Sequence, residues 1–579
     1  MRYGNRVISP SEIGWIRETH DSFRNPRVLA CAFVTLPRLS GVLLAGVLLL
    51  ARGFAANPVF AGPVEDAIRE RVERMASART FALGSTPIFA KALLPRLYER
   101  RGYHTAWNRE RLDALIGAVD GVARDGLVPS DYHEAALRKS RIAFDTEATR
   151  STDAVADRDL IATDALVCVA YHLSFGKVDP FRLDSKWNFP RTLNRHEATE
   201  ALLRVLDSGD ISHFLDGLRP RHPYYGYLRR ELASYQDRVA SGGWPKIPEG
   251  PTLKLGVRDH RILLLRKRLI ASDDLAAAAA SDTALGFDPS LENSVRSFQR
   301  RHLLADDGTV GPGTLAALNV SIGDRVNQLR VNLERARWLL HNLPDSFVVV
   351  NIAAFEAYLV AGSNRVWSTR CQVGKEGRET PVFRDTLRYI VFNPTWTVPT
   401  GILAKDVLPA LRRGDLSVLQ RKKLKVLDRQ GRMLNPRAIQ WSKVTAGNCP
   451  YTFRQDPGPD NALGRVKFMF PNPYSVYLHD TPSRDLFESP TRAFSSGCIR
   501  VDRPLELAER LLTGTKWDAA AIQRTVDSGK TVTVTLRRPL PVLLLYWTAF
   551  PSRDSRRITF AKDIYGRDAK VLRALEGGS

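Results

Sequence analysis

Cysteine is scarce in this sequence, which has five cysteines at irregular spacing among 579 residues. So few thiols do not make a disulfide framework, and no C-x-x-C pair indicates a zinc site. We therefore expect neither a metal nor a cofactor. Internal repeats are also missing, so the sequence does not predict a repeat architecture. The chain is 44% hydrophobic and long enough for several domains with cores of their own.

Acidic residues are in deficit: 62 Asp and Glu stand against 85 Lys and Arg, which gives a net charge of +23. This excess predicts an anionic partner or surface. We do not expect nucleic acid, because the basic residues are scattered along the chain and no nucleic-acid-binding motif is present. An anionic cell-wall polymer and a membrane surface fit the charge equally well, so charge alone does not decide between them.

The N-terminal region lacks a long apolar run but has the features of an export signal. Arg27 and Arg38 precede residues 39–51, an uncharged and mostly aliphatic run that is short for a membrane span. Val59-Phe60-Ala61 is a small-residue cleavage site. Residues 1–61 therefore form either a cleaved signal peptide or an anchor that associates the protein with the inner membrane. In both cases we expect the remainder to be exported to the periplasm or cell envelope.

Helical periodicity dominates the first half of the exported part. It extends over about 64–235 and ends at a proline-rich linker, 244–251. A small helical unit follows over about 253–319, in which Pro312 suits the first turn of a helix. Another helix is predicted around 326–341.

Strand-like segments follow that helix. They are Phe347–Ile352, Ala357–Val360, Tyr389–Phe392, Ser475–Leu478 and Thr531–Leu536. Between 399 and 461 lies a basic segment with little β pattern, which we interpret as an insertion that covers the sheet. Helices followed by strands predict a multidomain α+β chain.

His479 and Cys498 carry the clearest chemical signal. In acyl transfer a thiolate attacks a carbonyl, and an imidazole takes and returns the proton. A free cysteine has a pKa of about 8.5, and a neighbouring imidazolium lowers it. We expect His479 to do so from the end of an apolar strand at a sheet edge. The remaining cysteines have contexts that indicate inert or structural roles, or lie in the N-terminal segment: Cys31, Cys168, Cys371 and Cys449.

Small residues precede the sulfur and an arginine follows it. Ser495, Ser496 and Gly497 allow a tight turn, which would aim the amides of Ser496, Gly497 and Cys498 at a developing oxyanion. Arg500 can hold a carboxylate in a bidentate manner, which suits a substrate with a free carboxylate beside the scissile bond. Alone, a histidine after a strand or a Ser-Gly-Cys turn is usually structural, but the two together predict an active site.

The string from His479 through Thr481-Pro482 to Ser496-Gly497-Cys498-Ile499-Arg500 resembles the active-site signature of L,D-transpeptidases, in the branch of large periplasmic cell-wall enzymes. Further segments are similar to that branch or to a peptidoglycan-binding domain: Thr380–Phe383, Asn393–Pro399, Asn461–Phe468, Phe287–Gly311, Asp125–His133, Gly176–Pro180 and Tyr546–Asp568. Smaller members of the family have a histidine just before the Gly-Cys pair, where this chain has Ser496. We interpret the serine as a character of the larger branch.

The resemblance implies a division of the chain into five parts. They are a signal peptide or membrane anchor (1–61), a helical scaffold domain (62–250), a three-helix peptidoglycan-binding-like domain (251–322), a β-rich catalytic domain (323–540) with a capping-loop insertion (about 399–461), and a C-terminal tail (541–579).

The resemblance also implies an activity on peptidoglycan stem peptides. Cys498 would attack the carbonyl of the diamino acid at stem position three and expel the terminal D-alanine. The side-chain amine of a second stem would resolve the thioester into a 3→3 cross-link. The implied roles are general base and acid for His479, backbone oxyanion donors for Ser496 and Gly497, and substrate binding for Arg500, Tyr477 and Trp396, although the last two fit a core equally well.

Two alternatives to this activity remain open. With water as the acceptor, the same acyl-enzyme would make the protein an L,D-carboxypeptidase. A protein with an inactive site would be a structural, peptidoglycan-binding protein. The sequence does not show the shape of the cleft, on which the choice of acceptor depends.

Overall fold

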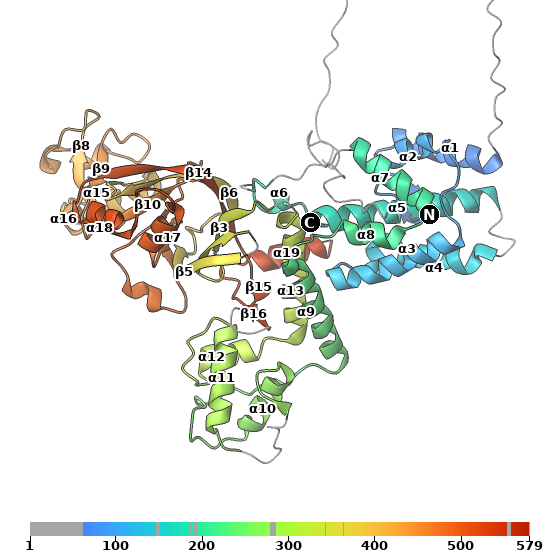
Figure 1. The fold of residues 1–579 in the computed structure, drawn as a ribbon, viewed down its shortest axis with the longest axis horizontal. Helices are drawn as coiled ribbons and strands as arrows, with labels where there is room; N and C mark the ends of the chain where they lie inside the picture. The colour runs from blue at the N-terminus through green and yellow to red at the C-terminus, as the bar shows by residue number, and fades with distance from the viewer. Residues whose placement is uncertain are drawn as a thin grey trace, which may run out of the picture. The chain divides into compact units, whose positions relative to one another are not determined.

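The computed structural model describes residues 62–145, 151–185, 187–189, 195–277, 285–341, 343–362, 364–552 and 557–577. The predicted export segment, residues 1–61, lies outside them. The chain divides into two compact units: residues up to 123, 128–174 and 191–219 form the first, and 124–127, 175–190 and 220 onward form the second. Helices make up the first unit, whereas the second combines helices with a large sheet (Figure 1).

The first unit is built around α5 (Thr152–Phe175), which buries most of its residues, Asp159 among them. The Asp159 carboxylate accepts hydrogen bonds from the Tyr98 hydroxyl (2.6 Å) and from the amide of Ala106 (3.0 Å), so its buried oxygens are satisfied. The surrounding elements are α1 (Pro63–Ser77), α2 (Leu94–Arg100), α3 (Arg109–Gly121), α4 (Glu134–Ile142), α7 (Arg195–Ser208), α8 (Ile211–Gly217) and the short strands β1 (Ala82–Leu83) and β2 (Thr86–Pro87). In the described part of the chain, no helix is both long and apolar enough to cross a membrane.

Two long helices, α9 (Pro223–Ala240) and α13 (Ile322–Leu339), pack together in the second unit. Helix α13 contains a fully buried ion pair in which Arg337 Nη2 lies 2.5 Å from Glu334 Oε2. Arg337 also donates a hydrogen bond to the carbonyl of Asp125 (2.7 Å). Each charge of this pair therefore has an opposite charge beside it.

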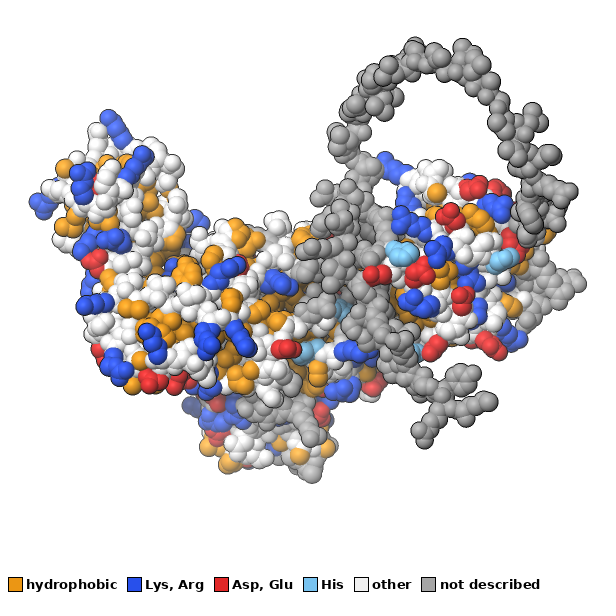
Figure 2. Space-filling view, turned by 45° about the horizontal axis from the view of Figure 1, so that its top comes forward, with side chains coloured by type: hydrophobic (Ala, Val, Ile, Leu, Met, Phe, Trp, Pro, Cys, Tyr) orange, Lys and Arg blue, Asp and Glu red, His pale blue; other side chains and the backbone are white. Residues whose placement is uncertain are grey.

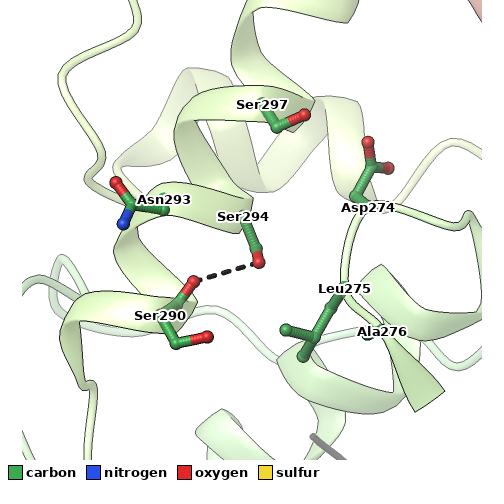
Figure 3. Close-up of a pocket in the computed structure, with 7 residues that line it drawn as sticks. All are labelled: Asp274, Leu275, Ala276, Ser290, Asn293, Ser294 and Ser297. Atoms are coloured by element: carbon green, nitrogen blue, oxygen red, sulfur yellow. Dashed lines mark hydrogen bonds between the residues drawn. The ribbon is translucent and has the colours of Figure 1, made fainter. Parts of the chain in front are cut away.

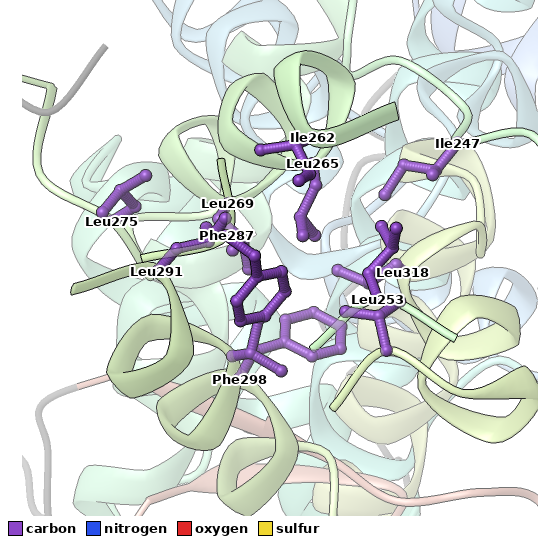
Figure 4. Close-up of a cluster of buried hydrophobic side chains, with 12 residues drawn as sticks. Ile247, Leu253, Ile262, Leu265, Leu269, Leu275, Phe287, Leu291, Phe298 and Leu318 are labelled. Carbon is purple, nitrogen blue, oxygen red and sulfur yellow. The ribbon is translucent and has the colours of Figure 1, made fainter. Parts of the chain in front are cut away.

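A small three-helix unit is formed by α10 (Arg261–Ala271), α11 (Pro289–Arg301) and α12 (Pro312–Leu318). The helices predicted here are confirmed, including the one that begins at Pro312. Apolar side chains from all three helices meet in one core (Figure 4), among them Ile262, Leu265, Leu269, Phe287, Leu291, Phe298 and Leu318.

A shallow pocket lies between α11 and residues 274–276 of this unit (Figure 3). Part of its polar lining is already engaged within the protein. Ser294 donates to the carbonyl of Ser290 (3.0 Å), and Ser297 accepts a hydrogen bond from Arg557 (2.9 Å).

The core of the second unit is a nine-stranded sheet. Its strands are β3 (Ser346–Asn351), β4 (Glu356–Ala361), β5 (Asn364–Gly374), β6 (Phe383–Phe392), β10 (Val466–Met469), β11 (Leu478–His479), β12 (Ala493–Ser495), β13 (Ile499–Val501) and β14 (Val532–Leu545). The order is β12-β5-β13-β11-β10-β6-β14-β3-β4, and β4 also pairs with β5, so the sheet closes on itself. Helices α17 (Pro504–Leu511) and α18 (Ala519–Asp527) lie between β13 and β14 in the chain.

Two predicted strands differ from the structure. The segment predicted over 475–478 pairs only as Leu478–His479, because Ser475 has a positive φ of 55° and bends the chain. The strand predicted over 531–536 continues to Leu545, past a register shift between Thr535 and Leu540 that accommodates two arginines and a proline. The remaining tail contains β15 (Ala549–Pro551), β16 (Ile558–Phe560) and α19 (Arg567–Leu575).

The insertion over about 399–461 has more β structure than its sequence predicts. Strands β8 (Lys425–Leu427) and β9 (Thr452–Gln455) pair with each other, and β7 (Trp396–Thr397) joins them. Short helices precede them: α14 (Thr400–Ile402), α15 (Leu408–Arg412) and α16 (Ser417–Arg421). The insertion has a core of its own, formed by Leu403, Val407, Leu411, Val418, Trp441 and Phe453 among others. It is therefore a small folded subdomain.

Basic side chains do not gather in one place on the face seen in Figure 2, where Lys and Arg are spread between apolar and acidic groups. Many of them pair with carboxylates, as Lys425 does with Asp456 and Arg370 with Glu488. The distribution agrees with the scatter seen in the sequence.

Candidate active site

His479 lies on β11 and Cys498 lies just before β13, the neighbouring strand of the closed sheet. Strand β11 runs parallel to β13, with Leu478 opposite Ile499 and His479 opposite Arg500. Cys498 immediately precedes β13, and the next amide, that of Ile499, donates to the carbonyl of Tyr477 (3.0 Å). Because β11 lies between β10 and β13, His479 is not at the sheet edge where we predicted it.

The His479 side chain is buried, with 4% of its surface exposed, and its Nδ1 is hydrogen-bonded to the carbonyl of Asp480. Because a carbonyl only accepts, Nδ1 must be the protonated nitrogen, and Nε2 is left with its lone pair. Burial, together with the charges of Arg500 and Lys467, lowers the pKa of His479 to about 3. The ring is therefore neutral at physiological pH and suited to accept a proton, whereas the sequence predicted an imidazolium.

The Cys498 thiol is half-buried and donates a weak hydrogen bond to the carbonyl of Ser475 (3.5 Å). Burial raises its pKa above the ordinary value. The groups that act in the opposite direction on this pKa are the amide and hydroxyl of Tyr477 and the charges of Lys467 and Arg500. Negative charge on the sulfur is thus supported by neighbours other than a charged histidine.

The turn before Cys498 is held by side-chain hydrogen bonds. Gly497 has a φ of 115°, which requires glycine. Its carbonyl accepts a hydrogen bond from the Thr380 hydroxyl (2.9 Å), and its amide donates to the Ser495 hydroxyl (3.1 Å). The Gly497 amide, which we predicted as an oxyanion donor, is therefore already engaged. The amides of Ser496 and Cys498 are the remaining candidates in this turn.

Two aromatic side chains connect the sulfur to the insertion. The Tyr477 side chain is close enough to the Cys498 sulfur and to the Trp396 side chain for both to shift the pKa of its hydroxyl. Trp396 belongs to β7 and packs against the core of the insertion. Burial and the adjacent thiol raise the pKa of Tyr477 above its usual range, so the hydroxyl stays protonated and can donate. Of the two aromatic residues that the sequence singled out, the structure therefore places Tyr477 beside the nucleophile and Trp396 beside Tyr477.

Lys467 is a residue whose role our sequence analysis missed. It lies on β10 directly opposite His479, which in turn lies opposite Arg500, so the three side chains share one face of the sheet. The Lys467 ammonium lies 3.8 Å from the centre of the Tyr477 ring. A lysine in the otherwise apolar strand Val466–Met469 was the signal that could have found it.

Arg378 is a second residue that we did not predict. Its guanidinium makes two bonds of 2.6 Å to Asp406 of the insertion and donates to the hydroxyl of Ser496 (2.9 Å). It therefore links the insertion to the turn that precedes Cys498. The pairing lowers the pKa of Asp406, which keeps the carboxylate ionised.

The described residues contain no group of three or more His, Cys, Asp or Glu side chains that could hold a metal ion. The site contains the parts of a cysteine acyltransferase: a thiol, a neutral imidazole, a turn with free amides, and cationic side chains. Such a site can form and resolve a thioester.

Family models match three parts of the chain. They are a scaffold domain over 92–232, a peptidoglycan-binding domain over 261–318, and an L,D-transpeptidase catalytic domain over 345–530. The resemblance seen in the sequence is thereby confirmed, and so is the predicted α+β organisation into a helical scaffold, a small helical binding domain and a β-rich catalytic domain. Cys498, His479 and Lys467 all lie within the catalytic match.

One curated relative, a protein of Haemophilus influenzae named provisionally as an L,D-transpeptidase, is 34% identical over 246 residues. The match covers 42% of this chain and 48% of the relative, so the chain spans about half the length of that protein.

Two solved L,D-transpeptidase structures are also similar. The one from Stackebrandtia nassauensis is 11% identical and covers 52% of this chain and 96% of its own, with a TM-score of 0.21. The one from Xylanimonas cellulosilytica is 15% identical and covers 52% and 99%, with a TM-score of 0.15.

Proposed function

Because the chain contains an L,D-transpeptidase catalytic domain, we propose that it is an enzyme that forms 3→3 cross-links between peptidoglycan stem peptides through a thioester on Cys498. One observation carries the proposal: the neutral His479 lies on β11, and Cys498 immediately precedes the adjacent parallel strand β13, in a turn where the Ser496 and Cys498 amides are candidate oxyanion donors. Arg500 adds a cation on the same face of the sheet, where a carboxylate of the stem can bind.

The first half-reaction acylates the sulfur. His479 Nε2 takes the thiol proton, and the sulfur attacks the carbonyl of the diamino acid at stem position three. The amides of Ser496 and Cys498 stabilise the oxyanion of the tetrahedral intermediate. When that intermediate collapses, the carbon–nitrogen bond to D-alanine breaks, and His479 returns its proton to the departing amine.

The second half-reaction releases the product. The side-chain amine of another stem attacks the thioester, its proton passes to His479, and the carbon–sulfur bond breaks. The proton then returns to the sulfur, so Cys498 and His479 end in their starting states. The insertion, which contacts the turn through Arg378, would keep water from the thioester while the amine binds. Hydrolysis of the same thioester would make the protein an L,D-carboxypeptidase.

The remaining parts of the chain fit the same substrate. The three-helix domain would hold the enzyme on peptidoglycan, and the net charge of +23 favours an anionic envelope. We therefore place the protein outside the cytoplasm, in the periplasm or at the inner membrane, and expect residues 1–61 to direct its export.

Incubation of the purified protein with a disaccharide-tetrapeptide, followed by mass spectrometry, tests the proposal. Cross-linked dimers that have lost one D-alanine support it, whereas tripeptide alone indicates the carboxypeptidase and unchanged substrate indicates a binding protein. Cys498→Ala should abolish every product while binding to peptidoglycan sacculi persists. Cys371→Ala is the matched control, because burial raises the pKa of that thiol to about 12 and makes it a poor nucleophile. Dimers formed by Cys498→Ala would refute the assignment of the nucleophile.

A further inference from the structure

The half-buried cations around Cys498 lack anionic partners. Within the described residues, Lys467 forms no ion pair or hydrogen bond. Its ammonium lies 3.8 Å from the centre of the Tyr477 ring, and negative charge on Cys498 acts to raise its pKa against the lowering effect of burial. Arg500 donates one hydrogen bond, to Gln372 (3.1 Å), and its buried Nε has no partner in the described part of the chain. Unpaired charges of this kind are costly to bury unless an anion compensates them.

The register of the sheet determines which anion Lys467 can compensate. Lys467, His479 and Arg500 lie side by side on β10, β11 and β13. The Lys467 ammonium lies over the ring of Tyr477, and Tyr477 in turn interacts with Cys498, since its amide and hydroxyl lower the pKa of that thiol. The ammonium is therefore coupled to the sulfur both by its charge and through the tyrosine ring that it covers.

A neutral histidine does not stabilise negative charge on the sulfur before proton transfer. When His479 takes the thiol proton, the resulting imidazolium stabilises the thiolate, but before that step the ring carries no charge. The titratable groups that act on the sulfur are Tyr477, just before β11, Lys467 from β10 and Arg500 from β13, and His479 lies on β11 between the two cations. Only Lys467 and Arg500 among them are cationic beforehand.

We propose that Lys467 is an electrostatic partner of Cys498 that stabilises negative charge on the sulfur. In this role Lys467 holds no proton that the reaction uses; it favours transfer of the thiol proton to His479 by attracting the charge that remains. The inference deepens the proposed function, because it concerns the same nucleophile. It does not depend on which acyl donor or acceptor the enzyme uses.

The experiment measures alkylation of Cys498 by iodoacetamide as a function of pH, with the modified peptide quantified by mass spectrometry. Alkylation forms a sulfur–carbon bond and releases iodide, and it reports the thiolate fraction without any peptidoglycan. Lys467→Met should lower the rate at pH 8 by about tenfold, which corresponds to a rise of about one unit in the thiol pKa. The difference should narrow as the pH is raised, because the thiolate then forms without help.

Two further variants distinguish charge from packing. Lys467→Arg keeps the charge and should retain a pH profile near that of the unmodified protein. Lys530→Met removes an exposed lysine two residues before β14, and this variant should have the same alkylation profile as the unmodified protein. If the alkylation rate of Lys467→Met falls by the same factor at every pH, or if Lys467→Arg shows the same fall, Lys467 has a packing role and the inference is overturned.

The outcome is separable from that of the proposed function. If Lys467→Met changes the alkylation profile but the protein forms no dimers, the inference stands and the transpeptidase proposal fails. If dimers form but the profile of Lys467→Met is unchanged, the inference fails alone. A raised KM for the tetrapeptide with an unchanged profile would show that Lys467 binds the substrate carboxylate, which also overturns the inference.

Discussion

Two sets of buried or half-buried charges in the second unit are organised in opposite ways. On α13, Arg337 and Glu334 are fully buried and 2.5 Å apart. Arg337 also donates a hydrogen bond to the Tyr225 hydroxyl (3.1 Å), and Glu334 accepts one from the Val178 amide (2.7 Å). At the candidate active site, Lys467 and Arg500 face the sulfur without any carboxylate partner among the described residues.

The difference separates a structural cluster from a functional one. A buried pair whose charges cancel needs no ligand or reacting group to compensate it. Removal of either partner destabilises the fold, because it leaves an uncompensated buried charge. Unpaired cations do not stabilise a fold, since their desolvation is not offset. They persist where a reacting group or a ligand supplies the negative charge during function. Four predictions test this distinction, and they are ordered by the size of the expected effect, with the pH effect taken per unit of pH.

Glu334→Gln should cause the largest change. It leaves the Arg337 charge buried without an opposite charge, so we expect the free energy of unfolding to fall by about 3–5 kcal/mol. Chemical denaturation monitored by circular dichroism measures this. Asp306→Asn, which breaks an exposed pair with Arg300, is the matched control and should cost less than about 1 kcal/mol. Equal effects of the two variants would contradict the structural role of the α13 pair.

Arg500→Gln should show the reverse pattern. Loss of a charge-assisted bond to a substrate carboxylate is expected to lower kcat/KM by about 10- to 100-fold, corresponding to roughly 1.4–2.7 kcal/mol. Because the arginine has no carboxylate partner in the protein, stability should be unchanged or slightly higher. Steady-state kinetics with a tetrapeptide and a denaturation curve of the same sample provide the two readouts. A large loss of stability with unchanged kinetics would place Arg500 with the structural cluster.

The neutral state of His479 predicts a pH dependence of stability. Its pKa is about 3 in the folded protein and about 6.5 in the unfolded chain, so between these values only the unfolded chain binds the proton. The contribution is complete above pH 6.5 and falls by about 1.4 kcal/mol per unit as the pH drops from 6.5 towards 3.

His479→Asn removes that titration, so the unfolding free energy of the variant should depend less steeply on pH over the same range. His260→Asn, at an exposed position, is the control and should keep the slope of the unmodified protein. Parallel curves for His479→Asn and the unmodified protein would mean that the ring is charged in the fold, and that the active-site cations are three rather than two.

The smallest effect should come from the pair Arg378 and Asp406. Its side chains are 16% and 31% exposed, so solvent screens the interaction. A double-mutant cycle of Arg378→Gln and Asp406→Asn should give a coupling energy of about 1 kcal/mol or less in unfolding measurements. A coupling several times larger would group this pair with the buried one on α13.

Helix and strand patterns predicted much of the fold. Proline and apolar spacing located α11 and α12, and the run of valines in β3 predicted a buried strand. The strands of the insertion were missed because they are only three and four residues long and each includes a basic residue. The continuation of β14 was missed because Arg537, Arg538 and Pro539 interrupt the alternation that signals a strand.

The candidate site was predicted in part, and the limits have a physical cause. Spacing and residue type singled out Cys498 and His479, because thiol and imidazole have few other reasons to be near a small-residue turn. The charge state of His479 depends on its burial and on Lys467 of the neighbouring strand. The register of the two strands places Lys467 opposite His479, and a linear sequence does not show that register. The Gly497 amide is engaged by Ser495, a contact that a linear pattern does not reveal.

The position of β14 determines when the catalytic domain can fold. This last long strand pairs with β6 on one side, at residues about 140 to 160 positions earlier in the chain, and with β3 on the other, at residues about 194 positions earlier. Contacts over such separations form slowly and expose unpaired strand edges until they are made. Synthesis or export must therefore deliver Leu545 before the ring of strands can close, and up to that moment β3 and β6 remain available to chaperones, proteases or another chain.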